Sequence, residues 1–448
     1  MKCISIVTFL LAIVTMTMAQ EEWDHTSWFK NRKYPVGADH TNASPDQIPA
    51  SGSNSTPFDA HDQLVDINSV HEFIHPGPQD ARGPCSALNA LANHGYISHD
   101  GVTNFDELRD ALVDVFAFDV GMAEFFLWHA LAASGSADMW TLSIGGHHPR
   151  TELNATYNLT GPTRGLSGTH VNFETDGSPT RWDLYDPRSG DPDDVNMNID
   201  FFKQLYDRLA GVADDEVDYN LTIVTQYKLD RILDSVKNNP NMFMSPSNAV
   251  IGSTVSYLLI SNVLANHSAE KPDGRLDRET LKSFFAVTED HQGGLQYTPG
   301  AEQIPCNWYR RHSSRPYTIQ DLNEDIRYMF TRNPDLLNKY FVGGNANSTA
   351  GNWVSLDIGK MSGGNYTLDS ILSKPNHPIC FAVASGPEFT APYIKALYKD
   401  VVPIYDLLDE KVVPLTKPLN CPHWYHLDYS LFDELKGYKM SLTWDEER

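Results

Sequence analysis

Apolar side chains recur at helical spacing through most of the chain from about residue 64 onward. In residues 104–118 they form a single stripe, which predicts an amphipathic helix, and Asn104 with Glu107 three positions later predicts a capping box at its start. Patterns that alternate as strands do are scarce. These features predict a mainly helical protein built as a single large domain. Further helices are expected at residues 121–134, 199–212, 247–266, 277–287 and within 384–413.

The N-terminal region lacks this helical pattern. Residues 1–19 combine a positive charge, an apolar run and small residues ending at Ala19, which is typical of a secretory signal peptide. Residues 20–63 are rich in Ser, Asn, Pro and Asp and contain two N-x-S/T sequons, which indicates a flexible glycosylated arm. Six more sequons follow. We therefore expect a secreted glycoprotein whose domain spans 64–430 and ends in a tail at 431–448.

Charge and hydropathy exclude several classes of partner. The formal net charge is −24, which argues against a nucleic-acid partner and against an anionic membrane surface. After the signal peptide, no apolar run reaches the length of about 18 residues that is needed to cross a bilayer. We expect neither nucleic acid nor membrane among the partners of this chain.

Four cysteines remain once the signal peptide is removed. Cys380 and Cys421 both lie near the C-terminus and are candidates for a disulfide, which would stabilise the fold by about 4 kcal/mol through its effect on chain entropy. Cys85 and Cys306 are then left. The sequence allows these two to pair with each other or to remain thiols.

Cys85 stands where a helix is expected to begin. Pro84 suits a helix start and residues 87–91 are good helix formers, so the sulfur should face the free backbone N–H groups of Ala87 and Leu88. Those donors and the positive helix end favour a thiolate, which can act as nucleophile, redox thiol or metal ligand. The alternative is a cysteine that is simply buried or disulfide-bonded.

The surrounding segment, "FIHPGPQDARGPCSALNALANHGYI", resembles the proximal segment of the heme-thiolate peroxidases, the family of chloroperoxidases and unspecific peroxygenases. The Pro-Cys turn, Ala-Leu-Asn and Asn-His-Gly stand at the family's spacing, but Ser86 replaces a second proline. The resemblance implies a chloroperoxidase-like domain that binds heme b through the Cys85 thiolate, with the N–H groups of Ala87 and Leu88 donating to the sulfur. A thiolate ligand favours O–O cleavage.

A second stretch, "HVNFETDGSPTRWDLYDP", resembles the family's distal Glu-x-Asp-x-Ser motif. The resemblance implies that the Glu174 carboxylate, the Thr175 carbonyl and the Ser178 hydroxyl bind Mg²⁺ or Mn²⁺ beside a heme propionate. It also implies that Asp176 supports the distal side by hydrogen bonding. Without the resemblance, a turn of this kind is usually a solvated loop.

The distal acid–base that the family uses to split peroxide is not found at its expected place. Longer members carry an Arg and a Glu seven residues apart on one helix, and these positions fall here on Ser247 and Thr254. Shorter members use a His, whose place is taken by Thr175. Three explanations stay open: a carboxylate such as Asp176 enters the pocket, the protein binds heme without efficient turnover, or this helix is misaligned.

The resemblance implies a secreted heme-thiolate peroxidase or peroxygenase that uses hydrogen peroxide to oxidise a small organic substrate. A non-catalytic heme-binding member of the same fold is the main alternative. A cysteine hydrolase with Cys85 as nucleophile is disfavoured, because the only nearby base, His94, would face away on the same helix. A structural glycoprotein that uses the fold as a scaffold is the remaining alternative.

Overall fold

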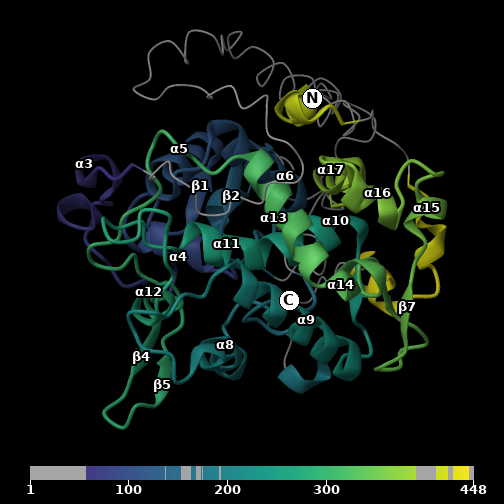
Figure 1. Ribbon diagram of the computed structural model, residues 1–448, viewed down its shortest axis with the longest axis horizontal. Coiled ribbons are helices and arrows are strands. Elements are labelled where there is room, and N and C mark those ends of the chain that lie inside the picture. The colour runs from purple at the N-terminus through teal and green to yellow at the C-terminus, as the bar shows by residue number, and fades with distance from the viewer. Residues whose placement is uncertain are drawn as a thin grey trace, which may run out of the picture. The chain divides into compact units, whose positions relative to one another are not determined.

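Helices far outweigh strands in the described part of the chain, and the expected mainly helical fold is confirmed (Figure 1). The computed structural model describes residues 57–136, 138–152, 163–167, 173, 175–190, 193–389, 410–421 and 427–442. The helices of these residues are α3 (Ala60–Gln63), η1 (Ser69–His71), α4 (Ser86–Asn93), α5 (Phe105–Phe116), α6 (Val120–Ser134), η2 (Pro149–Thr151), η3 (Pro187–Ser189), α8 (Ile199–Tyr206), η4 (Asp207–Leu209), α9 (Leu221–Asn238), α10 (Pro246–Val250), η5 (Ile251–Val255), α11 (Ser256–Val263), α12 (Arg278–Phe284), α13 (Ile319–Arg332), α14 (Pro334–Asn338), α15 (Ile358–Met361), α16 (Leu368–Ser373), α17 (His377–Phe389), α20 (Val413–Thr416), η6 (Lys417–Leu419), η7 (Tyr429–Phe432) and α21 (Lys436–Leu442). Their strands are β1 (Val102–Asn104), β2 (Thr141–Ser143), β3 (Phe243–Met244), β4 (Val287–Glu289), β5 (Leu295–Tyr297), β6 (Gly343–Asn345) and β7 (Trp353–Ser355).

Short antiparallel sheets tie together segments that lie far apart in the sequence. β1 pairs with β2, so that Val102 lies opposite Ser143. β6 is the middle strand between β3 and β7, and β4 pairs with β5 as a hairpin. Each strand has only two or three residues. The sheets are therefore too short to form a layer of the core, and each only joins two or three segments of the chain.

Helix α5 begins where its sequence pattern predicts, but the Glu107 carboxylate accepts from the Thr103 hydroxyl at 2.9 Å instead of completing the predicted capping box. The Asn104 side chain accepts a hydrogen bond from the Glu107 N–H, and Ala117 ends the helix in the left-handed region at φ 52°. The next helix, α6, is apolar on nearly every side and packs against α5, with the rings of Phe105 and Trp128 4.8 Å apart. A helix that is apolar all round belongs in a protein interior. These two helices form one side of the core.

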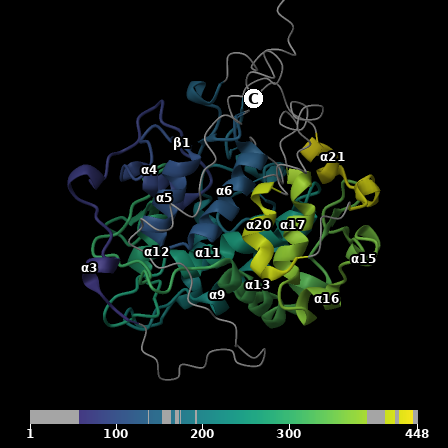
Figure 2. The ribbon, with the colours of Figure 1, turned by 90° about the horizontal axis from the view of Figure 1, so that it is seen from above.

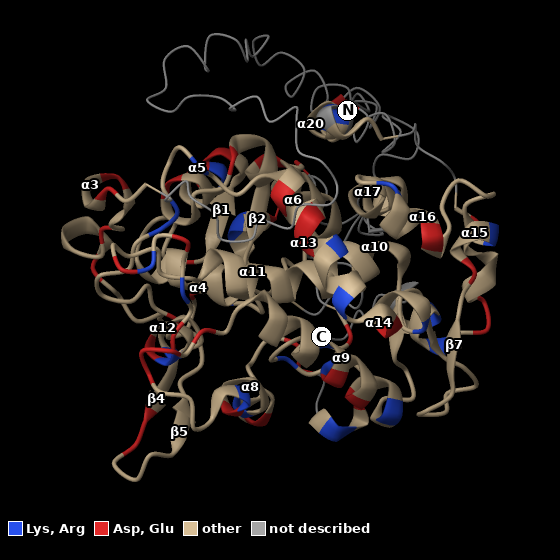
Figure 3. Cartoon of the chain, viewed as in Figure 1, with Lys and Arg blue, Asp and Glu red and all other residues tan. Residues whose placement is uncertain are grey.

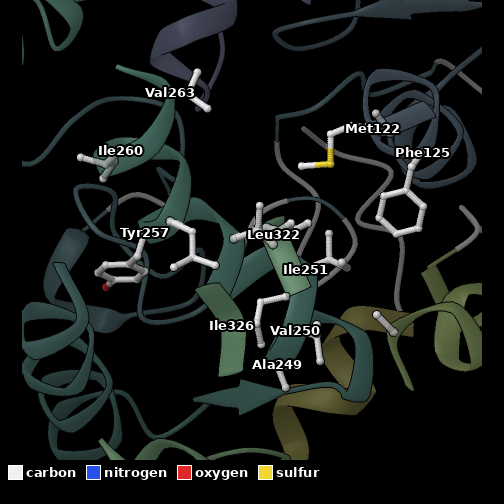
Figure 4. Packing of buried hydrophobic residues seen from close by; sticks show 14 of the residues in the cluster. Met122, Phe125, Ala249, Val250, Ile251, Tyr257, Ile260, Val263, Leu322 and Ile326 are labelled. Atoms are coloured by element: carbon white, nitrogen blue, oxygen red, sulfur yellow. The ribbon is translucent and has the colours of Figure 1, made fainter. Parts of the chain in front are cut away.

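The helix expected at residues 247–266 is built from three consecutive pieces. α10 runs into η5, which is a single π-helical turn, and η5 continues as α11. Ile251 of η5 and Leu322 and Ile326 of α13 belong to the same buried cluster, and η5 contacts α13 (Figure 4). A π-turn adds a residue to one helical turn and is frequent at functional sites.

Two expected boundaries differ from the structure. The arm was expected to extend to residue 63, but α3 packs onto the domain, where the amide of Gln63 donates to the carbonyl oxygens of His267 and Arg310. The C-terminal tail was expected from residue 431, but Phe432 is fully buried in the core. Most of the arm and residues 443–448 lie outside the described residues, as do residues 390–409 of the segment 384–413 in which a helix is expected.

The C-terminal helices are joined by the disulfide that the sequence suggested. Cys380 of α17 is bonded to Cys421, with an S–S distance of 2.13 Å, whereas Cys85 and Cys306 remain thiols. Both α17 and α20 contact α6 (Figure 2). This bond therefore links the end of the chain to helices that surround the central α6.

Charged residues of both signs share the helix surfaces. Lys or Arg and Asp or Glu lie side by side on α8 and α9 (Figure 3). Arg188 pairs with Asp186 and Asp234, and Arg208 pairs with Asp230. In the described residues, no helix combines the length and the apolar character that a membrane span needs.

Candidate active site

The turn before α4 fixes the position of Cys85. The Asn89 amide bonds the backbone of Gly83 twice, accepting from its N–H at 2.9 Å and donating to its carbonyl oxygen at 3.0 Å. A Cβ on Gly83 would lie 1.8 Å from the carbonyl oxygen of Ile144, so only glycine fits at this close approach. Cys85 is thereby held as the N-cap residue of α4.

The Cys85 side chain makes no capping hydrogen bond with the backbone N–H groups that follow it, so the predicted donation from Ala87 and Leu88 to the sulfur is not seen in this structure. The first hydrogen bond of α4 joins the Asn89 N–H to the Cys85 carbonyl oxygen at 3.1 Å. The N–H groups of Ser86, Ala87 and Leu88 therefore have no acceptor within the helix. They lie at the positive end of the helix dipole, which stabilises negative charge on a nearby sulfur.

Cys85 lies in the wall of a large cavity. The cavity encloses about 1310 Å³ that protein atoms do not fill, counted together with its opening to solvent. Apolar side chains dominate the wall, and they include the rings of Phe116, Phe118, Phe126, Phe173 and Phe285.

Polar groups on the described wall are few, and none of them is a carboxylate. Apart from Cys85, those that can carry a charge are His129 and Arg181. Burial lowers the pKa of His129 to about 4, so its imidazole is neutral at physiological pH. The other polar side chains of this wall are hydroxyls, from Ser86, Thr175, Ser178, Thr180 and Ser256.

Arg181 offers hydrogen-bond donors that the protein does not use. Its side chain is 2% exposed, and neither Nε nor Nη1 has a hydrogen-bond partner. Nη2 lies 3.8 Å from Oε1 of Glu302, too far for a hydrogen bond. A buried guanidinium with unused donors fits an anionic group inside the cavity. The carboxylate of a heme propionate has the required chemistry, so the residues present fit heme.

The turn at residues 175–178 forms another part of the wall. Thr175 and Ser178 line the cavity, and Gly177 takes a φ of +70° that favours glycine. The Gly177 N–H donates to Oδ1 of Asp183, whose pKa is raised to about 7 by burial and by the negative charge of Asp176. Glu174, the expected carboxylate ligand of a cation, lies outside the described residues.

Asp176 bonds to strand β3 and does not line the cavity. Its Oδ2 accepts a hydrogen bond of 2.8 Å from the Phe243 N–H of strand β3, and its side chain is fully buried. It does not belong to the cavity wall. The carboxylate thus fastens the 175–178 turn to β3, and the explanation in which Asp176 enters the pocket has no support in this geometry.

Ser247 and Thr254, the expected positions of the distal Arg and Glu, also lie off the wall. The Thr254 hydroxyl donates to the Ala249 carbonyl oxygen at 2.6 Å, and both side chains are fully buried. The residues of η5 that do line the cavity include Gly252 and Val255. The cavity-lining residues of this segment recur about every four positions, as at Ile251, Val255 and Leu259, and Thr254 lies between them.

Two wall residues had no assigned role in the sequence. Arg181 follows the Glu-x-Asp-x-Ser motif, but its unused donors become visible only in the folded chain. His129 lies on the apolar helix α6, where an ionisable residue among apolar ones is a usable signal, although Glu124 on the same helix gives that signal too. Neither side chain could be placed without the tertiary structure.

Comparisons with known proteins identify the family. The profile of the family described as "Peroxidase, family 2" matches residues 71–313. The chain is 33% identical over 384 residues to the dothistromin biosynthesis peroxidase dotB of Dothistroma septosporum, covering 85% of this chain and 88% of that protein.

Two further relatives support the same assignment. The aromatic peroxidase fscJ of Fusarium equiseti is 33% identical over 82% of this chain and 81% of its own. The aromatic peroxygenase of Cyclocybe aegerita is 31% identical over 48% of this chain and 56% of its own. The chain therefore belongs to the heme-thiolate peroxidase family and is an oxidoreductase of the peroxidase or peroxygenase type.

Proposed function

We propose that this protein is a secreted heme-thiolate peroxidase or peroxygenase that uses hydrogen peroxide to oxidise a small organic substrate. One observation carries the proposal. Cys85, at the N-terminus of α4, and Arg181, with unused buried donors, line the same large apolar cavity. A thiolate for iron and a cation for propionate are the two groups that heme b needs from this chain.

The residues of the cavity wall would have different roles in binding heme and substrate. Cys85 would hold the iron, and the N–H groups of Ala87 and Leu88 would moderate the charge on its sulfur. Arg181 would fix the propionate side. When bound, heme supplies the redox chemistry that activates peroxide. The phenylalanine rings of the wall would exclude water and admit an apolar substrate.

The divalent cation remains part of the proposal. Ser178 and Thr175 lie on the same wall as Arg181, so a cation bound there would stand near a propionate held by Arg181. The third expected ligand, Glu174, is outside the described residues. Within those residues, no group of three or more His, Cys, Asp or Glu side chains is arranged to hold a metal.

A non-catalytic heme binder is the second candidate function, because the described cavity wall contains no carboxylate that could act as the distal acid. A positioned acid–base normally transfers the proton when peroxide is split. The described wall contains no carboxylate, and His129 is its only imidazole. Val255, which lines the cavity next to Thr254, is the position where we propose that a distal acid could act.

Secretion and glycosylation also belong to the proposal. Of the sequon asparagines in the described residues, Asn220 and Asn347 are exposed and accessible to a glycan. Together with the signal-like N-terminus, they support passage through the secretory pathway.

Replacing Cys85 with serine tests the heme ligation. We expect the wild-type protein, produced in cells supplied with heme, to show the Soret band of a thiolate-ligated ferrous–CO complex. Cys85→Ser should lose that signature, because a hydroxyl is a far weaker ligand than a thiolate. Cys306→Ser, which removes the exposed thiol, is the matched control and should keep the signature. A colourless wild-type protein, or a Cys85→Ser spectrum of thiolate type, would refute the proposal.

Ser86→Pro tests the donors around the sulfur. Ser86 is the first residue of α4, a position that proline tolerates, so the fold should persist. The substitution removes one N–H beside the sulfur and should make the iron's reduction potential more negative. Spectroelectrochemical titration of both proteins measures the change. An unchanged or more positive potential would show that the Ser86 N–H does not act on the thiolate.

A further inference from the structure

A tyrosine lies directly behind the aromatic wall of the cavity. Phe118 lines the cavity, and Tyr317 packs behind it with the two ring centroids 6.2 Å apart. Their backbones form a parallel bridge, in which the Tyr317 N–H donates to the Ala117 carbonyl oxygen at 2.8 Å. Tyr317 is 1% exposed. Its ring is therefore shielded from solvent and separated from the cavity by a single aromatic side chain.

The hydroxyl of this tyrosine has a proton acceptor in place. It donates to Oδ2 of Asp325 on α13 at 2.7 Å, and the Asn262 amide donates to the same oxygen at 3.0 Å. Burial raises the pKa of Asp325 to about 7, so near neutral pH this carboxylate can both take up and release a proton.

The charge beside the ring determines how Tyr317 can be oxidised. The guanidinium of Arg311 lies 5.1 Å from the centroid of the Tyr317 ring. A neighbouring positive charge disfavours a cation radical on the ring. Loss of an electron must therefore be accompanied by loss of the phenolic proton, and the Asp325 carboxylate lies within the hydrogen-bond distance that proton transfer requires.

We propose that Tyr317 and Asp325 form a redox site in which Tyr317 gives one electron to the oxidant generated in the cavity. The inference rests on the proposed function, which supplies that oxidant as the peroxide-oxidised cofactor. The phenolic O–H bond breaks, the proton forms an O–H bond with the Asp325 carboxylate, and Tyr317 becomes a neutral tyrosyl radical. The oxidant is reduced by one electron. A one-electron donor of the phenol or aromatic amine class then reduces the radical, and the proton on Asp325 returns to the phenol oxygen.

Other aromatic residues near the wall lack one part of this arrangement. The Trp308 ring lies 6.0 Å from the wall residue Phe116, but its N–H donates to the Leu264 carbonyl oxygen. The Tyr257 hydroxyl donates to the Gly177 carbonyl oxygen at 2.7 Å. A backbone carbonyl cannot retain a proton near neutral pH, so neither site offers the transfer that Asp325 allows.

Tyr206 also donates to a carboxylate, but it lies farther from the cavity. Its hydroxyl is 3.3 Å from Oε1 of Glu289. The ring of Phe202 stands between Tyr206 and the wall residue Phe285, with centroid distances of 5.9 Å and 5.7 Å. Tyr317 has both the shorter hydrogen bond and the shorter path.

Freeze-quench EPR of the heme-loaded protein tests the site. A peroxyacid is the oxidant, because its better leaving group lessens the need for a distal acid. We expect a tyrosyl signal in the wild type that narrows when ring-deuterated tyrosine is incorporated. Tyr317→Phe should abolish the signal. Tyr257→Phe, the matched control with a hydroxyl on a backbone carbonyl, should retain it.

Asp325→Asn provides a second variant that keeps the shape of the site. An amide cannot accept the proton, so the signal should form more slowly and reach a lower yield. Glu324→Gln, which neutralises the exposed neighbouring carboxylate, should leave it unchanged. A wild type with a thiolate spectrum but no tyrosyl signal, or a signal that survives in Tyr317→Phe, overturns this inference alone. Absence of the thiolate spectrum overturns the proposed function as well.

Discussion

Val255→Glu is expected to raise the rate of hydrogen peroxide consumption by the heme-loaded protein by about 10²- to 10⁴-fold, the usual contribution of a positioned general acid–base. Val255 lies in the π-turn η5, is 2% exposed and lines the cavity. The apolar surroundings should raise the pKa of the new carboxyl toward neutrality, where it can accept a proton from peroxide and return it. Stopped-flow measurement at equal heme content determines the rate.

Two control variants separate proton transfer from mere placement of a polar group. Val255→Gln has the same shape without a titrating group and should stay close to the wild-type rate. Thr254→Glu places the carboxylate one residue earlier, where the side chain is buried off the wall and bonded to the Ala249 carbonyl oxygen. It should destabilise the protein without raising the rate. Equal gains in Val255→Glu and Val255→Gln would rule out an acid–base role at this position.

Helix α4, which begins directly after Cys85, shows which features can be predicted from the local sequence. Pro84 and the helix-forming run after it predict a helix start at this point, and α4 begins at Ser86 with Cys85 as its N-cap. The reason for Gly83 could not be derived in this way, because it depends on the Ile144 carbonyl oxygen, which lies about sixty residues later in the chain. Local capping chemistry is readable from the sequence, whereas a close tertiary approach is not.

The helical segment at residues 247–266 shows where periodicity fails to predict which side chains face the cavity. Apolar spacing correctly indicates a buried helix around residues 247–266, but it assumes 3.6 residues per turn throughout. The π-turn is an irregularity that this spacing does not indicate, and it is Val255, not Thr254, that lines the cavity. No residue type in this segment predicts a π-turn. The orientation of each side chain therefore had to come from the structure.

The ionisable residues of the wall show a related limit. His129 and Arg181 come from segments about fifty residues apart and are brought to one cavity only by folding. Their environment gives each its chemistry: burial keeps His129 neutral, and the distance of 3.8 Å to Glu302 leaves Arg181 with unused donors. Sequence motifs can nominate such residues, but burial and partners decide what they do.

The disulfide is expected to contribute about 4 kcal/mol to the free energy of unfolding, because it closes a loop with a sequence separation of 41 residues and so restricts the unfolded chain. Replacing both Cys380 and Cys421 with alanine should lower the unfolding free energy by about that amount, roughly a thousandfold in the equilibrium constant. Denaturant titration of non-reduced samples at equal heme content measures the difference.

The location of the bond makes its effect on the cavity testable in the same experiment. Cys380 lies on α17, and α17 contacts α10, the helix that leads directly into the cavity-lining π-turn. Loss of the bond should therefore loosen the distal wall, and the double variant should release heme at a lower denaturant concentration than the wild type. Cys306→Ala, which removes the exposed thiol, should change neither quantity. If heme release stays unchanged while the unfolding free energy falls, α17 does not support the wall through this bond.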